Sequence, residues 1–296
     1  MLFSFIQCSP AASPRAGNES HLLEVGVLQV ERVRPSSYGA SAARCTILIA
    51  PMKVFVIVPA AGLGTRMASP SAAKPKKKAP TKQFKELGGV PILVHTLRKF
   101  AATPEVYEII VALRHDEISG FRTQLESEYS EILAKRLQLV EGGEHRQDSV
   151  ASALARTAAD PEDIVLVHDA VRPFVTPEII ANVIEAAHKY GAAIAGWPAV
   201  DTVKQVERTA EGALIKATIP RASVVMAQTP QGFRYPLLKK AFDDAAADGF
   251  LGTDEASLIE RAGLPVMVIM GSHRNIKITT PADMELAEFY LKNAAS

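Results

Sequence analysis

A loop of small residues with one arginine follows a run of apolar residues near position 60. Residues 54–58 are Val-Phe-Val-Ile-Val, and the nine that follow are Pro-Ala-Ala-Gly-Leu-Gly-Thr-Arg-Met. Gly62 and Gly64 let the backbone approach a ligand closely, and Arg66 adds a permanent planar cation. Backbone N–H groups at the end of a buried strand, next to a guanidinium, suit the binding of phosphate groups.

The spacing of this loop differs from two common nucleotide-binding motifs. It is G-x-G-x-x-M, whereas a dinucleotide fingerprint ends in a small residue that packs a helix on a strand. Met67 does not suit that position, and no acidic residue follows about 20 positions later at the end of a second strand. A nicotinamide-dependent oxidoreductase is therefore disfavoured, and a lack of NAD(P)H binding would exclude it. The loop also lacks the G-x-x-x-x-G-K-[ST] sequence of a P-loop.

Lys82 is a second cation that could meet the same phosphates. It follows a stretch rich in lysine, proline and alanine, Ala72–Pro80, which predicts a mobile basic loop because proline disfavours a helix. The lysines inside that stretch are interpreted as a solvated charge run. Lys82 differs because Gln83, Phe84 and the following turn anchor it to the fold. Arg66 and Lys82 together would form a cationic clamp for a polyphosphate.

Asp169 is the candidate carboxylate of the chain. It directly follows an apolar run and His168, which we interpret as a histidine packed in a strand. A carboxylate at the end of a strand commonly binds a divalent cation, sugar hydroxyls or a neighbouring arginine. An ion pair with Arg172 or a helix cap is equally compatible with the sequence. Arg221 and Lys277 are single cations at the ends of apolar runs, and from sequence alone each is more typical of a surface charge.

Short β-branched runs that alternate with helical periods must position these residues. The strand candidates are Val54–Pro59, Tyr107–Leu113, Leu137–Glu141, Ile164–His168, Ala192–Pro198 and Val266–Gly271. The helix candidates are Pro91–Ala102, Glu117–Lys135, Gln147–Thr157, Pro177–Tyr190, Pro236–Ala247, Glu255–Ala262 and Pro281–Lys292. Thr176-Pro177 and Thr280-Pro281 each place a capping hydroxyl before a proline at the first helical position.

This alternation predicts an α/β fold with a mainly parallel, twisted sheet that is covered on both faces. Ligands of such sheets bind beyond the C-terminal ends of the strands. The loops that follow the first, third and fourth predicted strands, the last two being 142–149 and 168–173, should therefore meet along one edge.

One segment breaks the alternation. Thr202–Val206 and Ala213–Ala217 alternate apolar and polar residues around a turn, which predicts a β-hairpin. A two-stranded ribbon is marginally stable alone in water, so we expect it to pack on a second subunit.

Composition excludes several classes of partner and chemistry. The formal net charge is +1 and no apolar run of transmembrane length occurs, so neither nucleic acid nor a membrane is an expected partner. Cys8 and Cys45 both precede Met52, which removes thiolate catalysis and cysteine metal sites from the rest of the chain. Residues 1–51 show no sustained period and are interpreted as a disordered extension ahead of a single domain, 52–296. We expect a cytoplasmic protein, or a plastid protein if residues 1–51 are a transit peptide.

Eight motifs in this order resemble the 2-C-methyl-D-erythritol 4-phosphate cytidylyltransferase family, whose members join CTP to a branched polyol phosphate in the non-mevalonate isoprenoid pathway. They cover nearly everything from Met52 to Leu291. They are PAAGxGxRM from Pro59, KQF from Lys82, GGxxRxDSV from Gly142, VHDAxRP from Val167, DTVK from Asp201, QTPQ from Gln228, TDEAS from Thr253 and NIKIT from Asn275. The resemblance implies a single Rossmann-like nucleotidyltransferase domain with an arm at about 199–222.

The resemblance also implies a role for each matching residue. The nucleotide-binding residues would be Ala60, Ala61, Gly62, Gly64, Gly143, Glu144, Arg146 and Ser149. The substrate-binding residues would be Asp169, Arg172, Thr202 and Thr229. Arg66 and Lys82 would neutralise charge at the α-phosphate, while Arg221 and Lys277 would hold the incoming methylerythritol phosphate.

The implied reaction is an in-line attack of the substrate phosphate on the α-phosphorus of CTP, with pyrophosphate leaving together with Mg²⁺. Mg²⁺ would be held mainly by phosphates, with Asp169 as a candidate ligand. The arm with Arg221 would reach the site of the other subunit of a homodimer. A cytidylyltransferase for another polyol phosphate, such as ribitol 5-phosphate, is the nearest alternative. A catalytically inactive dimer that only binds CTP is another.

Overall fold

The computed structural model describes residues 51–62 and 81–293. Residues 52–296 form one compact unit. The predictions for the N-terminal extension, Gly64, Arg66 and the lysine-rich stretch Ala72–Pro80 fall on residues outside the described ranges. Within those ranges, none of the helices combines the length and apolar character needed to span a bilayer.

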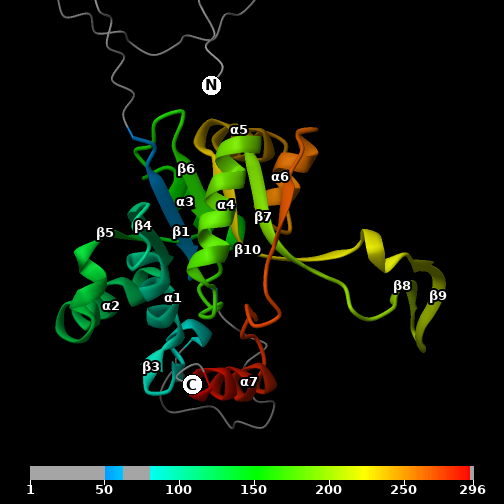
Figure 1. The fold of residues 1–296 in the computed structure, drawn as a ribbon, viewed down its shortest axis with the longest axis horizontal. Coiled ribbons are helices and arrows are strands. Elements are labelled where there is room, and N and C mark those ends of the chain that lie inside the picture. The colour runs from blue at the N-terminus through cyan, green and yellow to red at the C-terminus, as the bar shows by residue number, and fades with distance from the viewer. Residues whose placement is uncertain (1–50, 63–80, 294–296) are drawn as a thin grey trace, which may run out of the picture. The chain divides into compact units, whose positions relative to one another are not determined.

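A seven-stranded sheet forms the centre of this unit (Figure 1). Its strands are β1 (Val54–Pro59), β4 (Val106–Leu113), β5 (Arg136–Glu141), β6 (Ile164–Val167), β7 (Ala192–Pro198), β10 (Val225–Arg234) and β11 (Met267–Met270). Their order is β11-β7-β10-β6-β1-β4-β5. Only β10 among them runs antiparallel to its neighbours, so the predicted mainly parallel sheet is confirmed. A short ribbon, β2 (Glu86–Leu87) with β3 (Val90–Pro91), precedes the first helix.

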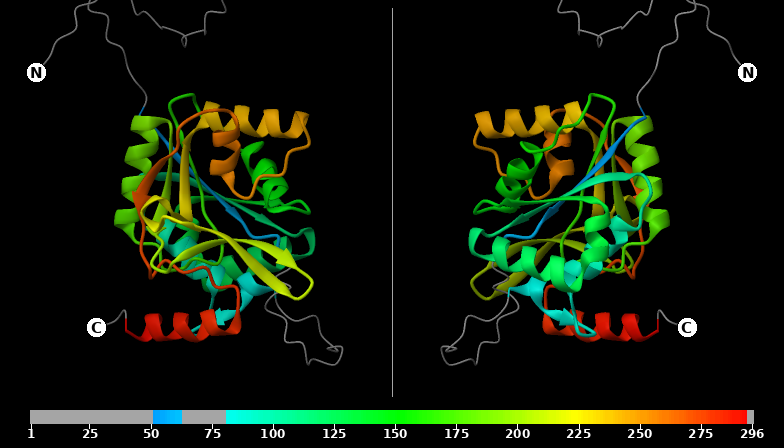
Figure 2. Two further views of the ribbon diagram at one scale, coloured as in Figure 1. Left: turned by 90° about the vertical axis from the view of Figure 1, so that its right-hand side faces the viewer. Right: turned by 90° about the vertical axis from the view of Figure 1, so that its left-hand side faces the viewer.

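Helices cover both faces of the sheet, as the alternating pattern predicts (Figure 2). They are α1 (Ile92–Ala101), α2 (His115–Glu128), α3 (Arg146–Leu154), α4 (Pro177–Tyr190), α5 (Tyr235–Ala247) and α6 (Glu255–Arg261). The last helix, α7 (Pro281–Lys292), packs instead in a separate cluster with β2 and the start of α1. Short 3₁₀ turns in the described ranges lie at Lys82–Phe84, Ser130–Ala134 and Arg221–Ser223. The predicted helix Glu117–Lys135 is divided: α2 ends at Glu128 and a 3₁₀ turn follows.

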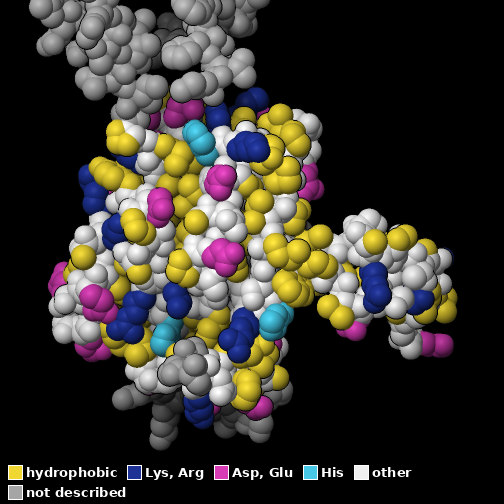
Figure 3. All heavy atoms as spheres, in the orientation of Figure 1, with side chains coloured by type: hydrophobic (Ala, Val, Ile, Leu, Met, Phe, Trp, Pro, Cys, Tyr) yellow, Lys and Arg dark blue, Asp and Glu magenta, His cyan; other side chains and the backbone are white. Residues whose placement is uncertain are grey.

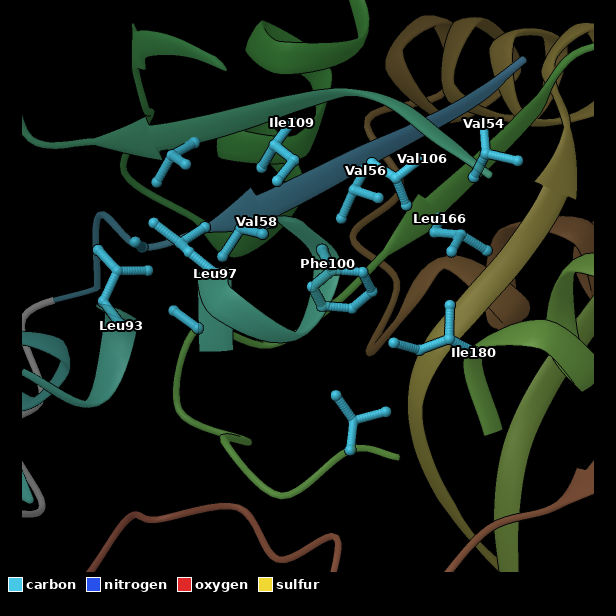
Figure 4. Close-up of a cluster of buried hydrophobic side chains, with 14 of the residues drawn as sticks. Val54, Val56, Val58, Leu93, Leu97, Phe100, Val106, Ile109, Leu166 and Ile180 are labelled. Carbon is cyan, nitrogen blue, oxygen red and sulfur yellow. The ribbon is translucent and has the colours of Figure 1, made fainter. Parts of the chain in front are cut away.

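Alternate side chains of β1 supply the two halves of the core. Val54, Val56 and Val58 face one way and pack with α1, α2 and α4 (Figure 4). Phe55 and Ile57 face the other way and pack with α3, α5 and α6. All five side chains are fully buried, which explains why this strand is an unbroken apolar run.

The two predicted helix starts are confirmed. The Thr176 hydroxyl accepts a hydrogen bond from the backbone N–H of Ile179, and Thr280 accepts one from Asp283. A proline occupies the first turn of each helix, where its missing N–H costs nothing. These caps fix where α4 and α7 begin.

The predicted hairpin is also confirmed, with longer strands than expected. It consists of β8 (Val203–Thr209) and β9 (Gly212–Ile219), which pair antiparallel. The hairpin projects from the body as an arm (Figure 1). Nearly all of its residues are exposed, including Leu214 and Ile215 at 62% and 64%.

Candidate active site

One pocket lies beyond the carboxyl ends of the parallel strands, where the three polar loops were predicted to meet. Its lining confirms that prediction. The lining residues are Pro59, Ala60, Ala61, Gly62, Lys82, Gln83, Gly143, Glu144, His145, Arg146, Ser149, Asp169, Ala170, Val171 and Lys277. All of the predicted nucleotide-binding residues that lie in the described ranges are thus brought together.

Lys82 is held next to the end of β1 by its neighbours. The Gln83 side chain is buried and donates from Nε2 to the backbone carbonyl of Ala60. The Phe84 ring packs edge-on against Phe121, with ring centroids 5.3 Å apart. These contacts anchor the 3₁₀ turn that carries Lys82, as the sequence predicts, and place the lysine on the pocket wall.

The loop between β5 and α3 approaches β1 too closely for larger residues. A Cβ on Gly142 would lie 2.6 Å from the Ala61 Cβ, and one on Gly143 would lie 2.3 Å from the Asp148 Cβ. His145 caps α3, since its backbone N–H donates to the Asp148 carboxylate at 2.9 Å. The buried Ser149 hydroxyl donates to the His145 carbonyl at 3.2 Å, which closes the loop.

Asp169 lies at the centre of a cluster of charges. One carboxylate oxygen accepts from Arg146 Nε at 3.3 Å. The other lies 3.1 Å from Arg172 Nε and 3.0 Å from Lys277 Nζ. The ion pair with Arg172 that the sequence left open is therefore present, with two further cations beside it.

Arg146 also contacts a residue that the sequence analysis did not single out. Both carboxylate oxygens of Glu255 accept from Arg146 Nη1, at 2.7 and 2.9 Å. Glu255 begins α6 and is 1% exposed. Its position inside the TDEAS motif was the available signal, but the motif alone does not show which cation it meets.

These contacts shift the protonation equilibria of the cluster. Burial disfavours the charged form of Asp169, but Arg146, Lys277 and Arg172 outweigh it and hold the pKa of this carboxyl below its ordinary value. Burial opposes the charge of Arg146 as well, yet Glu255 and Asp169 raise the pKa of its guanidinium. For Glu255, burial dominates and raises the pKa of the carboxyl. The cluster is thus built to keep Asp169 and Arg146 ionised.

His168 is a packed histidine, as predicted. It is fully buried, its Nε2 lies 3.0 Å from the Arg172 carbonyl and its Nδ1 lies 3.1 Å from the Thr229 hydroxyl. Because a carbonyl only accepts, Nε2 carries the proton and the Thr229 hydroxyl donates to Nδ1. Burial lowers the pKa of His168 to about 4, so the ring is neutral near pH 7.

Thr229 and Arg172 were both expected to bind substrate, and both are engaged by the protein itself. The Thr229 hydroxyl accepts from the backbone N–H of Asp169 at 3.0 Å and is buried. Arg172 donates from Nη1 to the Asn275 carbonyl at 2.7 Å. The Asn275 side chain donates in turn to the Thr229 carbonyl at 2.9 Å. These bonds favour a supporting role, in which they hold Asp169 and the loop of Lys277 in place.

Two predicted site residues lie on the arm and do not reach this pocket. Arg221 follows β9, is exposed and donates from Nη1 to the Val200 carbonyl at 2.9 Å. Thr202 precedes β8 and is exposed too. Neither belongs to the lining of the pocket in the same chain.

The described residues do not fit a Mg²⁺ ion held mainly by the protein. Both oxygens of Asp169 already accept from cations, which leaves little room for a metal. Across the described ranges, no group of three or more His, Cys, Asp or Glu is placed to hold a metal ion. The involvement of Mg²⁺ stays a prediction.

Comparisons with known proteins agree with this architecture. A family model described as 2-C-methyl-D-erythritol 4-phosphate cytidylyltransferase matches residues 54–293. A protein of that name from Acidobacterium capsulatum is 58% identical over 245 residues, which make up 83% of this chain and 100% of the relative. The relative from Solibacter usitatus is 51% identical over 83% of this chain and 98% of its own length.

Solved structures lead to the same family. The crystal structure of the Thermus thermophilus cytidylyltransferase of that name superposes with a TM-score of 0.62 at 34% identity, over 81% of this chain and 100% of the other. The Anaerococcus prevotii 4-diphosphocytidyl-2C-methyl-D-erythritol synthase gives a TM-score of 0.67 at 31% identity, over 81% and 96% of the two chains. The chain therefore belongs to the 2-C-methyl-D-erythritol 4-phosphate cytidylyltransferase family.

Proposed function

We propose that this chain transfers the cytidylyl group of CTP to 2-C-methyl-D-erythritol 4-phosphate, giving 4-(cytidine 5'-diphospho)-2-C-methyl-D-erythritol and pyrophosphate. The observation that carries the proposal is the pocket at the carboxyl edge of the sheet. Lys82, Arg146, Asp169 and Lys277 converge there from separate loops. Relatives that bear the name of this activity align over four-fifths of the chain.

The nucleotide would occupy the side of the pocket formed by the end of β1 and the 142–149 loop. Ala61 and Gly62 would offer backbone groups to the ribose and triphosphate, and Ala60, whose backbone groups are bonded to Ala112 and Gln83, would line the wall beside them. Gly143, Glu144 and Ser149 would meet the cytosine; the glycine at 142 lets this loop come close to Ala61 after β1, and the glycine at 143 lets it lie against Asp148 of α3. Arg66 and Gly64 are proposed to complete the phosphate side on the strength of the motif alone.

The reaction needs positioning and charge neutralisation rather than a covalent intermediate. The acceptor phosphate oxygen attacks the α-phosphorus of CTP, and the bond to the pyrophosphate oxygen breaks in line with it. Lys82 on the pocket wall would neutralise charge that builds on the α-phosphate. Lys277 would bind the acceptor phosphate, exchanging its present contact with Asp169 for the new anion.

Mg²⁺ is proposed to enter the site with the nucleotide, bound mainly by phosphate oxygens. Asp169 would lie at the sugar and substrate side and would not be a main ligand of the ion, because both of its oxygens are engaged by cations.

We propose a homodimer in which each arm completes the site of the other subunit. The arm exposes apolar side chains, and further exposed apolar residues lie where it leaves the body and along the edge strand β11 (Figure 3). These residues are Val200, Val206, Leu214, Ile215, Val225, Met226, Met267, Val268 and Met270. A second copy would cover this surface and bring Arg221 and Thr202 to the polyol phosphate.

Pyrophosphate release from CTP, measured with the full-length protein, tests the activity. Methylerythritol phosphate should support release, and ribitol 5-phosphate should not, since the relatives are named for the former. Release with ribitol 5-phosphate alone would contradict the proposal, and no release with either would indicate an inactive CTP-binding protein. The cytoplasmic location expected from the sequence stays a prediction.

A further inference from the structure

Glu255 is a buried carboxylate behind the pocket. The residue is 1% exposed, and it does not belong to the pocket lining. Burying a carboxylate is costly unless hydrogen bonds and an opposite charge compensate for it. Among the described residues, the opposite charge and the side-chain hydrogen bonds that compensate for it come from Arg146, which lines the pocket.

Arg146 bridges two carboxylates unequally. Its Nη1 lies 2.7 and 2.9 Å from the Glu255 oxygens, whereas its Nε lies 3.3 Å from Asp169. The closer and doubled contact to Glu255 therefore sets where the guanidinium lies. Since Arg146 is the first residue of α3, the same contact holds the end of the 142–145 loop.

The backbone at Glu255 is itself held firmly. Asp254 caps α6, and its carboxylate accepts from the N–H of Ser257 at 3.0 Å. Gln231 of β10, a buried residue, donates to Asp254 at 2.7 Å and accepts from the N–H of Ala256 at 3.1 Å. Glu255 is thus tied to the central sheet rather than to a surface loop.

The negative charge of Glu255 keeps the three cations of this cluster from depending on a single carboxylate. Arg146, Arg172 and Lys277 share the two carboxylates of Asp169 and Glu255. Without the charge of Glu255, all three cations would depend on Asp169. Arg146 would then turn toward Asp169 and compete with Lys277 for it, and the 142–149 loop would lose its anchor.

We propose that Glu255 is a positioning residue: it fixes Arg146 and thereby the loop that the proposed function assigns to the cytosine of CTP. The inference rests on that function, but it makes a separate claim. Loss of Glu255 should weaken recognition of the base more than recognition of the phosphates.

Calorimetric binding of CTP and of inorganic tripolyphosphate to the full chain tests this claim. Glu255→Gln keeps the size of the side chain but removes its charge. We expect its Kd for CTP to rise about tenfold and its Kd for tripolyphosphate to change less than about twofold. The KM for CTP should rise in parallel, while kcat at saturating CTP changes less than about threefold.

Two further variants separate positioning from folding. Ser257→Ala removes the hydroxyl that bonds back to the Asp254 backbone at the start of α6 but leaves Glu255 and the Asp254 cap, so it should lower the thermal unfolding temperature without changing the Kd for CTP. Glu255→Asp keeps the charge on a shorter side chain and should recover part of the CTP affinity, which also keeps the test available if Glu255→Gln does not fold.

Three outcomes of these measurements would contradict either the inference or the proposed function. Equal Kd values for CTP in wild type and Glu255→Gln would overturn the inference while leaving the proposed function intact. Equal losses for CTP and tripolyphosphate would overturn it too, because the effect would not concern the base. A wild-type chain that fails to bind CTP would instead overturn the proposed function.

Discussion

The body and the arm of this chain differ in how their charged residues are held. At the pocket, Asp169 contacts three cations, and its backbone N–H donates to the Thr229 hydroxyl of β10. On the arm, exposed Arg221 donates to the Val200 carbonyl, and the apolar side chains of Leu214 and Ile215 are exposed on the same arm. The body therefore presents a preorganised half of a site, and the arm presents residues that need a second surface.

This difference indicates a division of labour. Preorganised charges in the body can bind the nucleotide in a fixed geometry, because little reorganisation is needed at the moment of reaction. The described part of the chain gives the arm no comparable support, so in the proposed dimer Arg221 would act only once another copy orders it. Variants of the body and of the arm should therefore differ in what they impair.

Lys82→Ala should have the largest effect, because it removes the cation proposed to face the α-phosphate. We expect kcat to fall on the order of 10²–10³-fold, by analogy with the loss of one oxyanion donor. Steady-state pyrophosphate release measures it. Lys85→Ala is the matched control: it changes a lysine three residues away that does not line the pocket, and it should keep near-normal turnover. Near-normal turnover of Lys82→Ala would refute the assignment of Lys82.

Arg221→Ala should reduce kcat/KM for the polyol phosphate by about 10²-fold, since a charge-assisted contact to phosphate is lost. The KM for CTP should stay nearly constant, because the arm is not part of the nucleotide half. Arg208→Ala removes an exposed arginine from the same hairpin and serves as control. Equal effects of both variants would show that the arm acts only through its fold.

Leu214→Asp should weaken the proposed dimer by placing a charge on the exposed apolar face of the arm. Sedimentation should show monomers at micromolar protein, with activity lowered by about tenfold and restored at higher concentration. Leu133→Asp, at a leucine of the body that is 39% exposed, should leave sedimentation unchanged. A fully dimeric Leu214→Asp variant with wild-type activity would count against the arm as an interface.

His168 should make the stability of the body depend on pH, which is a smaller effect. The pKa of His168 is about 4 in the folded chain and ordinarily 6.5, so as the pH falls the unfolded chain takes up this proton at a higher pH than the folded chain does. Stability should therefore fall as the pH drops from about 6.5 to 4, by about 3 kcal/mol in total for this group. Denaturant unfolding of wild type and His168→Gln at several pH values measures the difference. His95 also has a lowered pKa, so only the change in slope between the two proteins is diagnostic.

Much of the body could be predicted from local pattern. The apolar run of β1 and the Thr-Pro starts of α4 and α7 are local signals, and the observed bounds match them. β10 was not predicted because Gln228-Thr229-Pro230-Gln231 interrupts its apolar residues, and its pairing with β7 breaks between Ala227 and Gln231. Its hydrogen bonds to β6 and β7 override the weak local preference.

Only part of the candidate site could be predicted from the sequence, because the rest depends on contacts between residues that are far apart along the chain. The meeting of three loops follows from parallel strands, so Lys82, Arg146 and Asp169 could be expected together. The contact of Arg146 with Glu255 joins residues 109 positions apart, and no local pattern reports it. The proposed role of Arg221 depends on a second copy of the chain, and in the sequence only the resemblance to the family points to that copy.

Subunit complementation tests most directly the claim that body and arm form one site across two copies. Lys82→Ala and Arg221→Ala proteins, each nearly inactive, would be unfolded together, refolded as a mixture and assayed for pyrophosphate release. Half of randomly paired dimers would be mixed, and each mixed dimer would hold one site with both cations, so activity should recover to about a quarter of wild type. A mixture no more active than its two components would contradict a site shared between subunits.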